Sequence, residues 1–312
     1  MHWTTRLAAA LLPAATAIAA TTPLAAQTSS PSPAPAMSAR DLVTLPRLGA
    51  PVAAPDGSFV VYAVTTTDAT TLDRKPAYYQ LDLATPGAQP RPLALPLRAS
   101  GLTLAGDGHL YFLSSEHPDS AAPRRARVWR IAISGTGVTG APQVVAAFPD
   151  IDIAGFKLAP QANRIAVWAQ VPRDCPTFGC GDRVNAHLPG PGSGRLYEGG
   201  QGFVRHWDTW SNPAAPHRVF VFGLENGAVA GEGVPIDGRD PSSGITANTP
   251  TLPFGGSEDI AFTPDGSAVY FNARLANRTE PGSTNLDIYV SELDGAAPTL
   301  VTRSNPATGS AC

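Results

Sequence analysis

The sequence contains 312 residues and carries a formal net charge of -3. This slightly acidic balance argues against nucleic-acid binding, which normally needs a basic face. Its 30 glycines and 32 prolines make up a fifth of the chain. That share falls short of the disordered range but suits a fold made of strands and turns.

The first segment, residues 1–26, has the pattern of a secretory signal peptide. Arg6 supplies the positive charge, residues 7–20 form a short apolar run, and small residues favour cleavage after Ala26. A membrane anchor is the alternative, but the run is too short and too rich in alanine for a good one. We therefore expect a periplasmic or secreted protein, with no stable membrane insertion after cleavage.

A linker rich in proline and serine follows at residues 27–37, and its composition offers nothing to bury. We expect ordered structure from Ser38, a candidate N-cap for one short helix. Signal cleavage leaves about 270 to 285 residues, enough for one large or two small domains.

Four later segments share a pattern of apolar strand, tight turn and second apolar strand. Their sequences are "VAAPDGSFVVYAV", "LTLAGDGHLYFLS", "FKLAPQANRIAVWAQ" and "IAFTPDGSAVYFNA". Three of the turns contain Asp-Gly, where the aspartate bonds locally and the glycine accepts a positive φ. The third has Gln161-Ala162-Asn163 instead, which predicts a different type of turn.

The spacing of these hairpins indicates a repeat. The turns are separated by 51 residues from Asp56 to Asp107, 54 from Asp107 to Gln161, and 104 from Gln161 to Asp265. A second hairpin follows each one, and two hairpins in about 50 residues form one four-stranded blade of a β-propeller. The sequence thus predicts an all-β β-propeller.

The predicted propeller domain covers residues 38–312. Its blades are expected at about 48–96, 100–148, 151–236 and 255–302, with an insertion at 172–216 that accounts for the long interval. Four blades are at the low end for a closed propeller. We expect part of a larger propeller of seven or eight blades, truncated after residue 312.

The insertion contains two cysteines, Cys175 and Cys180, five residues apart among prolines and glycines. A single C-x4-C pair is weak evidence for zinc, and the six histidines show no metal-binding spacing, so no metal site is predicted. The expected export favours a local disulfide. Cys312 has no obvious partner.

No sequence pattern indicates a catalytic or cofactor site. The chain has no G-x-S-x-G nucleophile elbow and no glycine-rich loop that leads into a helix. Glu258 and Asp259 are adjacent carboxylates, but they directly precede a strand and lack an identified partner for acid/base work. We therefore predict no catalytic residue, no metal and no cofactor.

The insertion also holds the densest group of functional residue types, within "GFVRHWDTWSN". It comprises Arg205, His206, Trp207, Asp208 and Trp210. An acid/base role would leave the histidine and aspartate with no nucleophile or metal to serve. We therefore interpret the motif as structural: Arg205 pairs with Asp208, and two buried tryptophans hold a folded-back insertion in place.

Three stretches carry a resemblance to a known family. The segments "DLVTLPRLGAPVAAPDGSFVVY" and "FVRHWDTWSNPAAPHRVFVF", with the cysteine pair, resemble the N-terminal propeller of bacterial prolyl oligopeptidase-family (S9) serine peptidases of the dipeptidyl or acylaminoacyl type. The resemblance covers residues 38–311. The third-blade turn and the shortened segment after Cys180 depart from the family pattern.

The resemblance implies a partner domain that this sequence does not contain. In the family, a C-terminal α/β-hydrolase domain carries the Ser-Asp-His triad, and the propeller restricts entry to short peptides. None of the catalytic positions has a counterpart here, so the chain alone is expected to be inactive.

Two alternatives stay open at this stage. One is a free-standing, TolB-like periplasmic propeller that binds a protein or peptide partner. The other, with weaker support, is a hydrolytic site built by the insertion itself. A hydrolase domain encoded beyond Cys312 favours the peptidase, whereas a natural stop codon there favours the binding module.

Overall fold

The computed structural model describes residues 36–119, 121–184, 205–206, 209–210, 212–242, 245, 247–274 and 285–302. The chain divides into two compact units, residues 1–42 and 43–312. A short helix, α1 (Ala39–Thr44), begins directly after Ser38. The Asp41 N–H donates to the Ser38 hydroxyl at 3.1 Å, and the Ser38 N–H donates to the Asp41 carboxylate at 2.9 Å. Ser38 thus satisfies one of the free N–H groups at the start of the helix, as an N-cap does.

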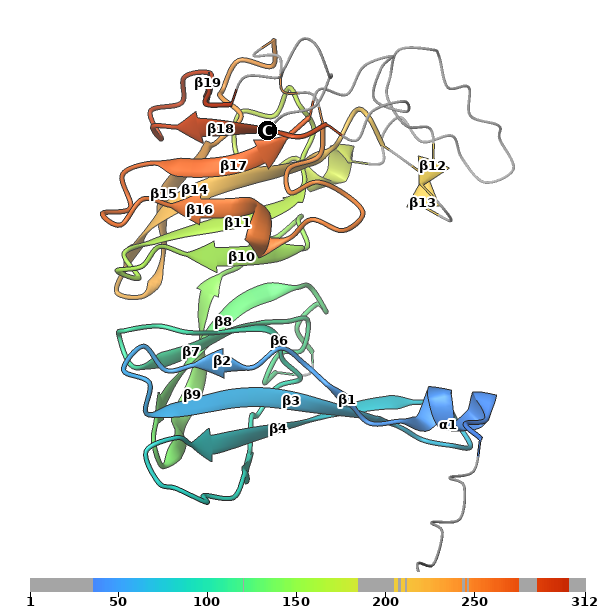
Figure 1. Cartoon of the computed structure of the whole chain (residues 1–312). Coiled ribbons are helices and arrows are strands. Elements are labelled where there is room, and N and C mark those ends of the chain that lie inside the picture. The colour runs from blue at the N-terminus through green and yellow to red at the C-terminus, as the bar shows by residue number, and fades with distance from the viewer. Residues whose placement is uncertain are drawn as a thin grey trace, which may run out of the picture. The chain divides into compact units, whose positions relative to one another are not determined.

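The unit from residue 43 onward is built of antiparallel sheets (Figure 1), and four of them follow one another along the chain, the third being interrupted by the insertion that carries β12 (Arg205–His206) and β13 (Thr209–Trp210). We call them the first to fourth blades, and their strands are as follows. The first blade contains β1 (Arg47–Leu48), β2 (Val52–Ala53), β3 (Phe59–Thr67), β4 (Arg74–Asp82) and β5 (Arg91–Leu93). The second blade contains β6 (Ser100–Leu104), β7 (His109–Ser114), β8 (Arg127–Ser134) and β9 (Gly137–Ala146), and the third contains β10 (Gly155–Leu158), β11 (Arg164–Gln170), β14 (His217–Glu225) and β15 (Ala228–Pro235). The fourth blade contains β16 (Ile260–Phe262), β17 (Val269–Ala273), β18 (Asp287–Ser291) and β19 (Thr299–Leu300).

The strand order confirms the predicted all-β fold of four-stranded blades. The second, third and fourth sheets have orders β6-β7-β8-β9, β10-β11-β14-β15 and β16-β17-β18-β19. The first sheet repeats the same order and gains β1, which pairs with β3 beside β2. The blade number of the intact propeller stays a prediction.

The expectation of a different turn in the third blade is wrong. Ala162 lies in the left-handed region at φ 51°, as Gly57, Gly108 and Gly266 do in the other three turns. Its N–H donates to the Ala159 carbonyl at 2.9 Å, which matches the bond from Gly57 to Ala54 at 2.8 Å. The β-hairpin therefore imposes the same backbone path on Ala-Pro-Gln-Ala as on Ala-Pro-Asp-Gly, and alanine takes a conformation that normally favours glycine.

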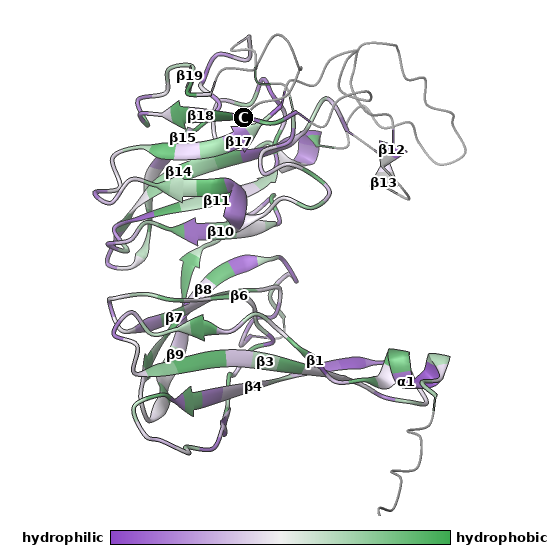
Figure 2. Cartoon of the chain, viewed as in Figure 1, coloured by the Kyte–Doolittle hydropathy of each residue, from purple (hydrophilic) through white to green (hydrophobic). Residues whose placement is uncertain are grey.

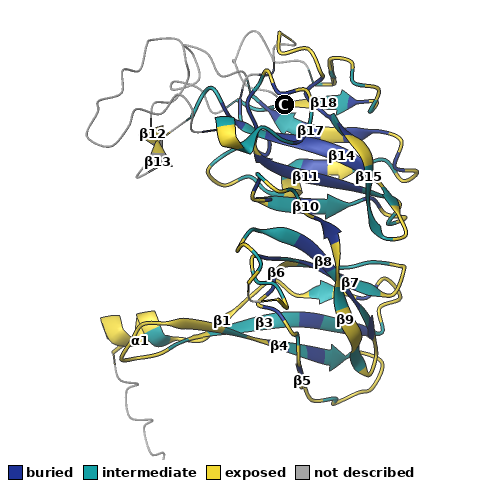
Figure 3. Ribbon diagram, turned by 180° about the vertical axis from the view of Figure 1, so that it is seen from behind, coloured by how far each residue is buried: buried dark blue, intermediate teal, exposed yellow. Residues whose placement is uncertain are grey.

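Among the described residues, three apolar clusters form the core, and each joins successive blades. In β11, Ile165 and Val167 belong to the cluster with the second blade, whereas Ala166 and Trp168 belong to the cluster with the fourth. A strand covered on both faces needs a continuous apolar run rather than alternation, which "RIAVWA" provides. Hydrophobic residues along β3 are visible in Figure 2, and Figure 3 shows β11 and β14 as largely buried and α1 as exposed.

Candidate functional site: the insertion anchor

The insertion leaves and re-enters the third blade at neighbouring positions. β11 and β14 pair without interruption from Arg164 opposite Gly223 to Gln170 opposite His217. Two further backbone bonds extend this pairing into the insertion, from the Val171 N–H to the Pro216 carbonyl at 3.1 Å and from the Arg173 N–H to the Ala214 carbonyl at 3.3 Å. The base of the insertion is therefore a continuation of the sheet.

A disulfide between Cys175 and Cys180 closes a small loop directly after this base. The loop places Phe178 in the core between the second and third blades, where its ring meets Phe148 at a centroid distance of 4.6 Å and Phe220 at 5.4 Å. The Gly181 N–H donates to the Asp150 carboxylate at 2.7 Å. The loop is thus held by a covalent bond, by aromatic packing and by a charge-assisted hydrogen bond.

A buried ion pair lies beneath the loop, between Arg218 on β14 and Asp237, two residues beyond β15. Their side chains are 3% and 7% exposed. Nε of Arg218 donates to Oδ2 of Asp237 at 2.7 Å, and Nη2 donates to Oδ1 at 3.0 Å. This two-point geometry matches the planar guanidinium to the carboxylate and compensates part of the cost of burying both charges.

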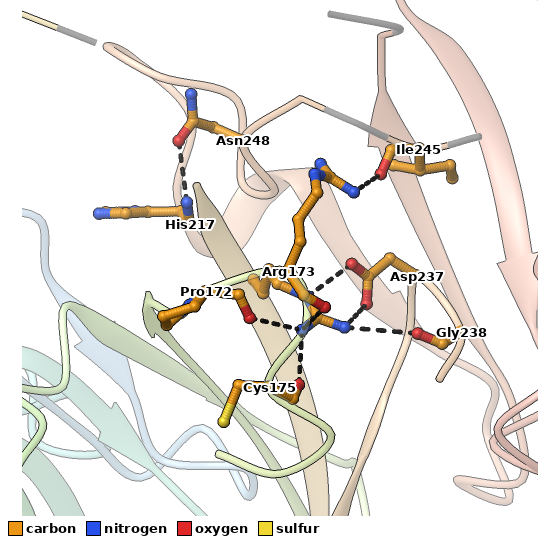
Figure 4. A network of polar contacts seen from close by, with 9 residues as sticks. Pro172, Arg173, Cys175, His217, Asp237, Gly238, Ile245 and Asn248 are labelled. Atoms are coloured by element: carbon orange, nitrogen blue, oxygen red, sulfur yellow. Dashed lines mark hydrogen bonds and ion pairs between the residues drawn. The ribbon is translucent and has the colours of Figure 1, made fainter. Parts of the chain in front are cut away.

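Nη2 of Arg218 also donates to the Gly238 carbonyl at 3.4 Å, and Nη1 binds backbone carbonyls of the insertion (Figure 4). Nη1 donates to Pro172 at 3.3 Å, to Arg173 at 3.3 Å and to Cys175 at 3.0 Å. Arg218 therefore ties three parts of the chain together: strand β14, the start of the insertion, and the segment after β15. We call these residues, with the disulfide loop, the insertion anchor.

Burial changes the pKa of two further side chains of the anchor, Arg173 and His217. The guanidinium of Arg173 donates to the Ile245 carbonyl, and burial lowers the pKa of Arg173 while neighbouring Asp237 opposes that change. Burial also lowers the pKa of His217 to about 4, so its imidazole is neutral at pH 7. The His217 N–H donates to the Asn248 side chain at 2.9 Å (Figure 4).

The motif that the sequence singled out lies in the same insertion but is only partly described. Arg205–His206 forms β12 and pairs with Thr209–Trp210, which forms β13. The Arg205 guanidinium lies 5.5 Å from the centre of the Trp210 ring, within the range of a cation–π contact. Trp207 and Asp208 lie outside the described residues.

The expectation of two buried tryptophans is wrong for Trp210. Its exposed fraction is 59%, so this ring does not fasten the insertion by burial. Sequence reasoning missed the residues that do, Arg218 and Asp237. The available signal was an arginine in the otherwise apolar run "HRVFVF", because a buried charge needs a partner.

No group of three or more His, Cys, Asp or Glu in the described ranges could hold a metal ion. Asp259 accepts a bond from the Thr251 N–H at 3.0 Å and another from Asn272 at 3.4 Å, so its carboxylate orders the loop before β16. None of the helices that the structure describes is long and apolar enough to cross a membrane.

The four-stranded blades and the anchored insertion define a protein of the propeller class. Comparison with known proteins shows which of them the chain is similar to. The dipeptidyl-peptidase 5 of Aspergillus fumigatus is 26% identical over 267 residues, which covers 83% of this chain and 34% of the relative. The probable dipeptidyl-peptidase 5 of Aspergillus niger is 30% identical over 128 residues, which covers 38% of this chain and 17% of the relative. The chain therefore spans about a third or less of the curated relatives it matches.

Among solved structures, an acylaminoacyl peptidase from Pyrococcus horikoshii has a TM-score of 0.48 at 9% identity, over 84% of this chain and 33% of that chain. No family model matches the chain. The resemblance to S9 peptidases that the sequence predicts is confirmed by the dipeptidyl-peptidase 5 relatives.

Proposed function

We propose that this chain is the non-catalytic propeller part of an exported S9-type serine peptidase, and that it restricts access to a hydrolase domain to short peptides. The observation that carries the proposal is the similarity to dipeptidyl-peptidase 5, which runs along 83% of this chain but occupies only 34% of the relative. The rest of such a protein has room for a catalytic domain. There, acyl transfer from the peptide to a serine and then to water would cleave the peptide bond.

The insertion anchor supports a gating role. A loop that borders an entrance must be held at its base by rigid elements, because loops carry function most precisely on a fixed scaffold. Here the base is a sheet extension, a disulfide loop and a buried ion pair. In the proposal, the insertion sets the size of peptide that reaches the hydrolase domain, and the anchor keeps that limit constant.

The test compares the chain with the longer protein that the genomic reading frame encodes. We expect the longer protein to release dipeptides from dipeptidyl nitroanilides and from peptides of increasing length, at rates that fall with length. We expect the chain of residues 1–312 alone to release none. A longer protein that lacks residues 185–204 is expected to cleave long peptides faster and short ones at an unchanged rate.

A matched control is the longer protein with Ala162→Gly, which changes a turn outside the insertion anchor. It should keep the original dependence of rate on length. A reading frame without a hydrolase domain would contradict the peptidase proposal. An unchanged length dependence after the deletion would contradict gating by the insertion alone.

Export is part of the proposal and has a separate test. The apolar run at residues 7–20 behind Arg6 and the small residues before Gln27 support cleavage by signal peptidase. Protein recovered from the periplasm or the medium should begin at or near Gln27 by N-terminal sequencing. Protein that retains Met1 and stays in the cell would show that these residues do not direct export.

A further inference from the structure

The second cysteine of the disulfide loop has a strained backbone. Cys180 lies in the left-handed region, at φ 61° and ψ 31°, and the short helix η1 (Gly181–Arg183) begins at the next residue. For a residue other than glycine, this conformation has a cost that corresponds to a factor of about 5 to 30 in an equilibrium. Contacts beyond the backbone of Cys180 itself must therefore hold it there.

The left-handed turn at Cys180 brings the next residue against the chain that leads from the second blade to the third. The Gly181 N–H donates to the Asp150 carboxylate at 2.7 Å. A Cβ on Gly181 would lie 1.8 Å from the Asp150 carbonyl oxygen, so only glycine fits at this close approach. The position of Gly181, and of η1 after it, therefore depends on the conformation of Cys180.

The disulfide fixes Cys180 to a rigid point. Cys175 is 1% exposed, and its carbonyl accepts a hydrogen bond from Nη1 of Arg218 at 3.0 Å. Phe178, between the two cysteines, is packed in the core. The bond to Cys175 thus ties Cys180 to a part of the insertion anchor that is held independently.

Two further contacts hold the residues after Gly181, and both are weak. Arg183 pairs with Asp174 at the surface, where an ion pair adds little to stability. The Asn212 side chain donates to the Val184 carbonyl at 2.8 Å. Oδ1 of Asn212 is buried and has no hydrogen-bond partner among the described residues, and this cost offsets the gain from that bond. The disulfide is therefore the strongest restraint on this segment.

We propose that the disulfide between Cys175 and Cys180 is a redox-sensitive switch, whose reduction releases residues 180–184 from the insertion anchor while the blades stay folded. Without the bond, Cys180 leaves the left-handed region, and Gly181 then moves away from Asp150. The change is local because the burial of Cys175 and Phe178 and the bonds of Arg218 do not depend on the disulfide.

The reductant in this proposal is a dithiol. One of its thiolates attacks Sγ of Cys180, which is only partly buried, whereas Cys175 is almost fully buried. The bond between the cysteines breaks, and Cys175 leaves as a thiolate that takes up a proton. The second thiol of the reductant then displaces Cys180 from the mixed disulfide. The reductant ends as a disulfide, and two electrons and two protons have passed to the cysteines.

The consequence for peptide length rests on the proposed function. If the insertion sets the size of peptide that reaches a hydrolase domain, the reduced protein should admit longer peptides than the oxidised one. The release of residues 180–184 does not depend on any peptidase activity, so it is tested separately on the chain of 312 residues.

The first test is hydrogen exchange of backbone amides, with and without excess dithiothreitol. Exchange at Gly181 should become at least about fivefold faster on reduction, because release of the strain at Cys180 favours the open segment by that factor or more. The internal control is Val171, whose N–H donates to the Pro216 carbonyl in the sheet extension and should exchange at an unchanged rate. An unchanged rate at Gly181, or an equal increase at Val171, would overturn the proposal.

Two variants test whether strain at Cys180 causes the release. Cys175→Ser with Cys180→Ser should exchange at Gly181 as the reduced protein does, with no response to dithiothreitol. Cys175→Ser with Cys180→Gly also lacks the disulfide, but glycine adopts the left-handed conformation at little cost. It should exchange at Gly181 at least about fivefold more slowly than the double serine variant. Equal rates in the two variants would overturn the proposed cause of release.

The second test uses the longer protein and the ratio of its cleavage rates for long and short peptides. Dithiothreitol should raise this ratio in the original protein and leave it unchanged in the variant with both cysteines replaced by serine. Faster exchange at Gly181 with an unchanged ratio would uphold the redox switch and contradict gating by the insertion.

Discussion

The two ends of strand β11 show two different ways to hold a connection. At its start, the turn from β10 closes with backbone hydrogen bonds, and Ala162 takes the conformation that glycine has in the other three blades. At its end, the connection to β14 depends on Arg218, Asp237 and a disulfide. The hairpin turn tolerates a changed sequence because its geometry comes from the flanking strands. The anchor relies on particular side chains, so substitutions there should cost far more.

The largest expected effect is loss of the buried carboxylate. Asp237→Ala leaves the Arg218 charge in a dry site without its partner, and the free energy of unfolding should fall by about 3 to 5 kcal/mol. Urea denaturation measures it. The matched control is Asp174→Ala, because Asp174 pairs with Arg183 at the surface, where their side chains are 65% and 43% exposed. That change should cost less than about 1 kcal/mol, and equal costs at the two sites would show that the buried pair adds nothing to the anchor.

The second largest expected effect is on the pH dependence of stability, and it comes from the titration of His217. Its pKa is about 4 in the folded chain, below the ordinary value of 6.5. Between these two values the unfolded chain binds more protons, so the free energy of unfolding should decrease as the pH falls from 6.5 to 4. The full loss is at most about 3 kcal/mol. His217→Gln should flatten the stability curve in this range, and a slope that survives the substitution would assign it to another group.

A smaller effect is expected from the disulfide. The bond between Cys175 and Cys180 closes a short loop, for which the loss of chain entropy on cross-linking corresponds to roughly 2 kcal/mol. Replacement of both cysteines by serine should lower the free energy of unfolding by about that amount. A reducing agent should have the same effect on the original protein and none on the double variant. If the agent destabilises the double variant equally, the effect does not come from this bond.

The smallest expected effect is an increase in the free energy of unfolding, whereas the changes above decrease it. Ala162→Gly relieves the side chain of a left-handed conformation and should raise the free energy of unfolding by about 1 kcal/mol. Gly57→Ala is the mirror experiment, because Gly57 has φ +72° with no atom within 4 Å of an added Cβ. It should lose about 1 kcal/mol through backbone strain alone. A loss at Ala162 as well would show that the two turns are not equivalent.

The sequence by itself determined the features that depend on neighbouring residues. Strand runs, the turns at Asp56, Asp107 and Asp265, the repeat of about 50 residues, and the proximity of Cys175 to Cys180 all follow from local spacing. Such features are set by backbone geometry and by side chains only a few positions apart. For that reason the fold class and the location of the insertion could be predicted before any tertiary contact was known.

Only the tertiary structure decided which residues hold the insertion. Arg218 meets Asp237 across 19 positions and the Pro172 carbonyl across 46, and no local pattern links them. The sequence predicted that the aromatic motif around Trp210 holds the insertion in place, yet the Trp210 ring is largely exposed. The physical reason is that the strength of a charged or aromatic contact depends on burial. Burial is a property of the assembled blades, and the order of residues along one strand does not reveal it.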